Sequence, residues 1–170
     1  VIEKAGADAI VIFVQTADQS WGPPYEFDYD IVKEIKEKIR IPVFINGGID
    51  SPKKAKEILL NTGSDGVVIG RAAVIDPTII KRTIYYLSTD QELNYPTAKE
   101  IFYLAKKHLW LSLRYYKEDF DFDLYMQQFM CGYIHHILCV LPMEKRYQII
   151  EKLMNIDTLS ELNELFILIE

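Results

Sequence analysis

The sequence has 170 residues, of which 49% are hydrophobic and 26% are charged, and its formal net charge is −6. This composition is typical of a globular protein, and no apolar run is long enough to span a bilayer, so we expect no membrane association. The negative net charge disfavours an extended surface that binds nucleic acid, although a local basic patch is still compatible with it. Two cysteines in a chain without a secretory signal predict free thiols and a cytoplasmic location.

The first predicted elements are a strand and an amphipathic helix, which are joined by an aromatic loop. The apolar run from Ala9 to Val14 is typical of a strand. In the loop that follows, Trp21 and Tyr25 either stack on a nucleobase or cover the rim of the sheet. The helix from Asp30 to Ile39 has its apolar residues on one face.

The stretch from Ile41 to Ala73 predicts two more strands, each followed by a glycine turn and a helix. Residues 42–45 and 66–69 are typical of strands buried on both faces, and Ser51 with Pro52 predicts a helix start. Because the carboxyl ends of parallel strands meet at one edge, the two turns should lie together. Their backbone N–H groups and the arginine suit a phosphate, and the candidate ligands are Asn46, Gly47, Gly48, Gly70 and Arg71. The alternative is that the glycines only make tight turns and that the arginine pairs with a surface acid.

The remaining residues predict helices. A helix is expected from Pro77 to Leu87, and a polar linker follows it to Pro96. Capping boxes at Thr97 and Thr158 predict two helix starts, and further helices are expected over 124–138 and 143–154. We therefore expect two domains, an α/β domain over residues 1–90 and a small all-α bundle over residues 91–170.

The segment NGGIDSPKKAKEILLNTGSDGVVIGRAA resembles the end of the barrel in the tRNA-dihydrouridine synthases, and nearly the whole chain is similar to this family. The resemblance implies the C-terminal part of a TIM-type (β/α) barrel, followed by a helical domain that docks tRNA. It implies that the two glycine turns hold the phosphate of FMN and that NAD(P)H is the reductant for uridine in tRNA. It also implies that the catalytic cysteine lies in the first half of the barrel, outside this chain, so no catalytic residue is assigned here. We expect the full-length protein to be a monomer.

Several positions depart from the family's pattern. Phe13 and Gln15 stand where the family has a histidine and an arginine that face the flavin, and we expect Phe13 to pack in the core. On the predicted docking helix, Gln127, Gln128 and Phe129 replace cationic or hydrogen-bonding residues, so we expect weak tRNA binding. The alternative function is a non-catalytic flavin- or phosphate-binding protein, or a paralogue that binds a protein partner through its acidic surface.

The same helix carries Cys131, His135 and Cys139 at successive intervals of four residues. This pattern places all three on one face, but the two cysteines are too far apart to reach one ion easily. We therefore expect no metal site, and we expect these side chains to pack in the core or against a partner.

Overall fold

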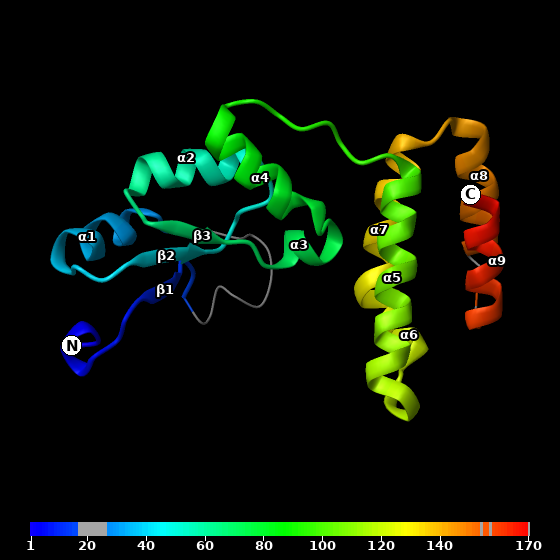
Figure 1. Cartoon of the computed structure of the whole chain (residues 1–170), viewed down its shortest axis with the longest axis horizontal. Helices are drawn as coiled ribbons and strands as arrows, with labels where there is room; N and C mark the ends of the chain where they lie inside the picture. The colour runs from blue at the N-terminus through cyan, green and yellow to red at the C-terminus, as the bar shows by residue number, and fades with distance from the viewer. Residues whose placement is uncertain (17–26, 154, 157, 170) are drawn as a thin grey trace. The chain divides into compact units, whose positions relative to one another are not determined.

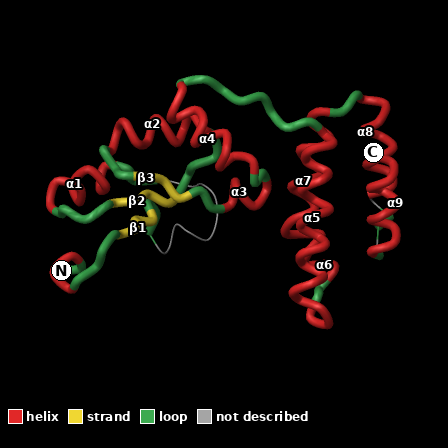
Figure 2. The backbone as a smooth tube through the Cα atoms, in the orientation of Figure 1, coloured by secondary structure: helices red, strands yellow, loops and turns green. Residues whose placement is uncertain are grey.

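Three short parallel strands organise the first half of the chain in the computed structural model (Figure 1). The structure describes residues 1–16, 27–153, 155–156 and 158–169. The chain divides into a first unit of Val1–Ala73 with Pro77–Leu93, and a second unit of Val74–Asp76 with Asn94–Glu170. The first unit is α/β and the described part of the second is helical (Figure 2).

The strands follow one another in chain order across the sheet: β1 (Ile10–Phe13), β2 (Val43–Asn46) and β3 (Gly66–Val68). Each lies within one residue of its expected bounds. Phe13 is the register partner of Asn46, and Asn46 is the register partner of Val68. The carboxyl ends of the strands, and the turns that follow β2 and β3, therefore meet at one edge as expected.

Helices cover one face of this sheet. Val43 and Ile45 point into a core that contains Val32 of α1 together with Ala55 and Ile58 of α2, and all five are at most 2% exposed. On the other face, the side chains of Val11 and Phe13 are 58% and 48% exposed. Within this chain Phe13 is therefore not a core residue, contrary to the prediction, because nothing in the described chain covers that face at β1.

The first unit contains η1 (Glu3–Ala5), α1 (Asp30–Lys38), α2 (Pro52–Thr62), α4 (Thr78–Thr89) and the start of α3 (Arg71–Ile75), whose last two residues belong to the second unit. Ser51 caps α2 as expected, since its hydroxyl accepts a hydrogen bond from Lys54 N at 3.3 Å. The short helix α3 follows Gly70 directly and was not expected. Helix α4 runs past the predicted end at Leu87, and it closes at Asp90, which has a left-handed φ of 63°.

The second unit contains α5 (Ala98–Tyr116), η2 (Lys117–Asp119), α6 (Phe122–Tyr125), the π-helical η3 (Met126–Met130), α7 (Cys131–Val140), α8 (Met143–Leu153) and α9 (Leu159–Ile169). Both predicted capping boxes form. Thr97 N donates to Glu100 Oε2 at 2.8 Å, and Thr158 N donates to Glu161 Oε2 at 2.9 Å. The single helix expected over 124–138 is longer and contains the π-helical segment.

The core of the second unit lies where α5 packs against α7 and α9 (Figure 2). Phe102 and Phe166 meet edge to face at its centre, with ring centroids 5.0 Å apart. None of the described helices is long and apolar enough to cross a membrane.

Candidate phosphate site

The two glycine turns of the first unit line one pocket of about 540 Å³. All five predicted ligands line it: Asn46, Gly47, Gly48, Gly70 and Arg71. The structure therefore brings together residues that are more than twenty positions apart in the sequence. The other lining residues are Phe13, Phe27, Ile49, Asp50, Val68 and Ala72.

The first turn is packed tightly against the aromatic residues that precede α1. Gly47 and Gly48 have φ values of 132° and 67°. A Cβ at Gly48 would lie 2.5 Å from Tyr29 Oη and 2.7 Å from the Phe27 ring. The fold itself thus requires these glycines, and sequence reasoning missed both aromatic neighbours because their contact with the turn is long-range.

The hydroxyl of Tyr29 fixes this turn. It donates a hydrogen bond to the carbonyl oxygen of Gly47 at 3.2 Å. Burial raises the pKa of the Tyr29 hydroxyl, with Lys54 opposing the shift, so the group keeps its proton. The Gly47 carbonyl is therefore engaged by the protein.

The second turn differs from the first, because its glycine is not required by packing. Gly70 does not have a positive φ. Among the described residues beyond its chain neighbours, a Cβ there would meet Asn46 Oδ1 alone within 4 Å, at an ordinary contact distance of 3.9 Å. The space above Gly70 is therefore part of the pocket, and a side chain at this position would fill it rather than clash with the protein.

The charged residues of the pocket are one arginine and one acid. Arg71 is exposed and begins α3, while Asp50 follows the first turn. A guanidinium and a side-chain amide are suitable donors to phosphate oxygens, and a carboxylate opposes an anion. The donor set fits a phosphate provided that Arg71, rather than Asp50, faces it.

Phe13 lines this pocket as well, at the end of the neighbouring strand. It offers an apolar ring where the family pattern has a histidine. Gln15 is half-buried and is not among the lining residues. Trp21 and Tyr25, the predicted stacking residues, lie outside the described residues.

Two aromatic residues of the predicted docking helix, Phe129 and Tyr133, pack inside the helical unit. Phe129 is partly buried against the ring of His108, with centroids 4.7 Å apart, and Tyr133 is only 3% exposed. The side chains of Gln127 and Gln128 are outside the described set. The side chain of Tyr133 therefore belongs to the core of the helical unit, and that of Phe129 packs against this core.

The cysteine–histidine pattern on α7 gathers no ligand set. Cys139 Sγ lies 3.8 Å from His135 Nε2, and both cysteines are exposed. Of the two expected alternatives, core packing is therefore wrong for the cysteines, and packing against a partner stays a prediction. Within the described residues, no group of three or more histidine, cysteine, aspartate or glutamate side chains is arranged to hold a metal ion.

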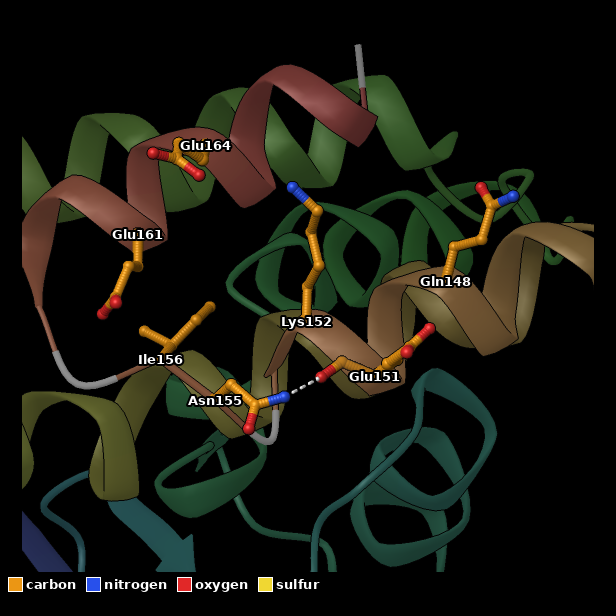
Figure 3. Close-up of a pocket in the computed structure, with 7 residues that line it drawn as sticks. All are labelled: Gln148, Glu151, Lys152, Asn155, Ile156, Glu161 and Glu164. Carbon is orange, nitrogen blue, oxygen red and sulfur yellow. Dashed lines mark hydrogen bonds between the residues drawn. The ribbon is translucent and has the colours of Figure 1, made fainter.

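A larger pocket, of about 620 Å³, lies between α8 and α9 (Figure 3). Glu151 and Lys152 approach it from α8, and Glu161 and Glu164 approach it from α9. Three carboxylates against one ammonium make it a poor anion site. Glu161 is in addition part of the capping box at Thr158, and we assign this pocket no ligand.

Comparison with known proteins gives a match to the family model described as dihydrouridine synthase over residues 1–163. The chain is 40% identical over 110 residues to tRNA-dihydrouridine synthase B of Pseudomonas syringae pv. tomato, covering 64% of this chain and 32% of the relative. It is 33% identical over 119 residues to a probable tRNA-dihydrouridine synthase of Rickettsia conorii, covering 70% and 35%. With tRNA-dihydrouridine synthase B of Xanthomonas campestris pv. campestris it is 32% identical over 142 residues, covering 72% and 42%. The matched part thus corresponds to between 32% and 42% of the length of these three relatives.

Proposed function

The chain belongs to the dihydrouridine synthase family, and on that basis we propose that it is part of a tRNA-dihydrouridine synthase. In this proposal the whole protein is an FMN-dependent oxidoreductase that reduces uridine in tRNA with NAD(P)H. The chain supplies the phosphate end of the flavin site and a helical domain that docks the tRNA. The protein acts in the cytoplasm, as a monomer.

The observation that carries the flavin part of the proposal is the open space at Gly70. The fold requires the glycines of the first turn, but it does not require Gly70, where a Cβ would occupy the pocket. A ligand that comes close to the backbone explains a glycine at such a position. The neighbouring Arg71 is positively charged and therefore favours a ligand that carries negative charge.

The bare face of the sheet supports the barrel part of the proposal. One face is covered by α1 and α2, while Val11 and Phe13 on the other face are 58% and 48% exposed. In a TIM-type barrel, helices cover the outer face of the sheet and side chains of the other strands fill the interior. We propose that the remaining strands of such a barrel cover Val11 and Phe13.

FMN, when bound, supplies the hydride chemistry. Arg71 balances the charge of its phosphate, and the side-chain amide of Asn46 and the turn N–H groups provide further donors. Phe13 gives the pocket an apolar wall at the end of β1. It cannot donate a hydrogen bond, so phosphate contacts carry more of the binding than in a site with a histidine there.

The test compares FMN with riboflavin, which lacks the phosphate, in binding to the full-length protein. Replacement of Arg71 by Ala should weaken FMN binding by about 1.5–3 kcal/mol, the scale of a charged hydrogen bond, and leave riboflavin binding unchanged. The matched control is Arg40→Ala, because Arg40 is an exposed arginine of the same unit that precedes β2 and so lies at the opposite edge of the sheet. Equal losses for both flavins, or an equal effect of the control, would contradict the assignment.

A non-catalytic paralogue is the second candidate, and the residues at the end of β1 favour it. Phe13 lines the pocket and Gln15 is uncharged, where the family's pattern has a histidine and an arginine. The full-length protein would then bind FMN but form no dihydrouridine when given NAD(P)H and unmodified tRNA. Formation of dihydrouridine in that assay excludes this candidate.

A further inference from the structure

Helix α5 presents a stripe of basic and aromatic side chains to solvent. Residues spaced by three or four positions share one face of a helix. The stripe, which we call the α5 stripe, consists of Lys99, Tyr103, Lys106, Lys107, Trp110 and Arg114, and all six are exposed. No long basic run is visible in the linear sequence, because apolar residues separate Lys99 and Arg114 from the pair Lys106 and Lys107.

The aromatic members of the stripe are accessible to solvent. Tyr103 is 66% exposed and Trp110 is 55% exposed, and both line a shallow pocket of about 540 Å³ with Lys99, Lys106 and Lys107. The guanidinium of Arg114 lies over the Trp110 ring, 5.2 Å from its centroid. The stripe therefore combines flat rings with cations that are held beside them.

The stripe is also locally positive in a chain with net negative charge. The one acid of α5, Glu100, is committed to the capping box at Thr97. Another cation of the same unit, Arg146, donates to the carbonyl oxygens of Leu141 and Cys139 instead. Apart from Glu100, the residues of α5 itself include no acid, and its cations are gathered on one face of the helix.

We propose that the α5 stripe is an RNA-binding surface of this protein. Lys99, Lys106, Lys107 and Arg114 contact phosphates, and the rings of Tyr103 and Trp110 stack on bases that are not paired. Cations alternating with exposed rings match the alternation of phosphates and bases in an unpaired strand. The inference rests on the proposed function, because the RNA in question is the tRNA substrate. It places the tRNA contact on α5 rather than on the helix over 122–140.

The test measures binding of the full-length protein to an unmodified, fluorescein-labelled tRNA transcript over a series of salt concentrations. Lys99→Ala with Lys107→Ala should weaken binding and reduce the slope of log affinity against log salt by about two units. The matched control removes two lysines of α8, Lys145→Ala with Lys152→Ala, and should leave the slope unchanged. Circular dichroism of each variant checks that the helices are intact.

The stacking part is tested separately. Trp110→Ala should weaken tRNA binding by about five- to 150-fold, corresponding to about 1–3 kcal/mol for one stacked base, while Trp110→Phe should retain most of the affinity. Equal losses in the α8 control, or unchanged binding in the α5 variants, would overturn the inference. The inference would also be overturned if the unsubstituted protein bound vesicles containing phosphatidylserine but did not bind tRNA. Because FMN affinity is measured on the same samples, failure of the stripe can be told apart from failure of the flavin assignment.

Discussion

The hydroxyl of Tyr133 and Nδ1 of His108 lie 3.3 Å apart inside the helical unit. The imidazole ring of His108 also meets Tyr125 and Phe129, with centroids 5.4 Å and 4.7 Å away. Burial lowers the pKa of His108, and burial raises the pKa values of Tyr125 and Tyr133. Near neutral pH this cluster therefore consists of uncharged rings.

The first prediction concerns the pH dependence of stability. Because the pKa of His108 is lower in the folded than in the unfolded state, the unfolded chain binds more protons between the two values. Stability from this group is complete above the unfolded pKa of about 6.5 and is lost as pH falls through the folded pKa. Denaturant titrations of the protein at pH 7.5 down to pH 5 should show this decline, with a slope no steeper than about 1.4 kcal/mol per pH unit.

His108→Gln carries no titrating ring and should flatten this dependence. The control is His135→Gln, because His135 is an exposed histidine of the same unit. If His108→Gln keeps the full pH dependence, another group is responsible for it.

The second prediction compares two glycines with nearly the same backbone conformation. Gly48 and Gly63 have φ values of 67° and 66°, so an alanine is equally strained at both. A Cβ at Gly63 would meet none of the described residues within 4 Å, whereas one at Gly48 would meet Tyr29 Oη at 2.5 Å. Gly48→Ala should therefore reduce the free energy of unfolding by about 1–3 kcal/mol more than Gly63→Ala, the usual cost of overpacking. If denaturant titrations gave equal losses for the two variants, the residues around Gly48 would accommodate the added methyl group without a loss of free energy.

The third prediction is that the two units differ in their ability to fold alone. The helical unit has a core of its own, which includes Phe102, Ile137 and Phe166. The first unit leaves Val11 and Phe13 of β1 uncovered, and an open apolar sheet face is a poor independent surface. A fragment of residues 94–170 should unfold cooperatively on heating, and a fragment of residues 1–93 should aggregate or lack a cooperative transition. A monomeric, cooperatively unfolding 1–93 fragment would contradict this expectation.

Local signals explain which parts of the fold could be predicted from the sequence. Ser51 before Pro52, and the capping boxes at Thr97 and Thr158, fix helix starts through contacts three residues apart, and all three appear in the structure. The α/β order of the first unit followed in the same way from strand and turn patterns. The gathering of Asn46 and Gly70 at one pocket followed from the parallel order of the strands.

What the sequence did not predict depends on long-range contacts or on the surroundings of the sheet. The packing of Tyr29 against Gly48 joins residues nineteen positions apart. The sequence predicted Phe13 to be a core residue, whereas it lines the pocket. An apolar side chain is suited to both places, so the sequence alone does not distinguish them. The α5 stripe required the helical arrangement, because Lys99, Lys106 and Arg114 are separated by apolar residues in the sequence.

The last prediction concerns Gln127 and Gln128, which lie in the π-helical η3 and stand where the family's pattern has cations. Replacing them by Arg and Lys should raise the affinity for tRNA and steepen the salt slope by about two units if both reach phosphates. The α5 stripe lies on a different helix, so we expect this gain to persist in the Lys99→Ala, Lys107→Ala background. A control that adds two cations elsewhere, Gln91→Lys with Gln148→Arg, separates local contact from net charge. If the control gains as much affinity, general attraction explains the result; if neither variant gains, the paralogue that no longer docks tRNA on this helix becomes the better account.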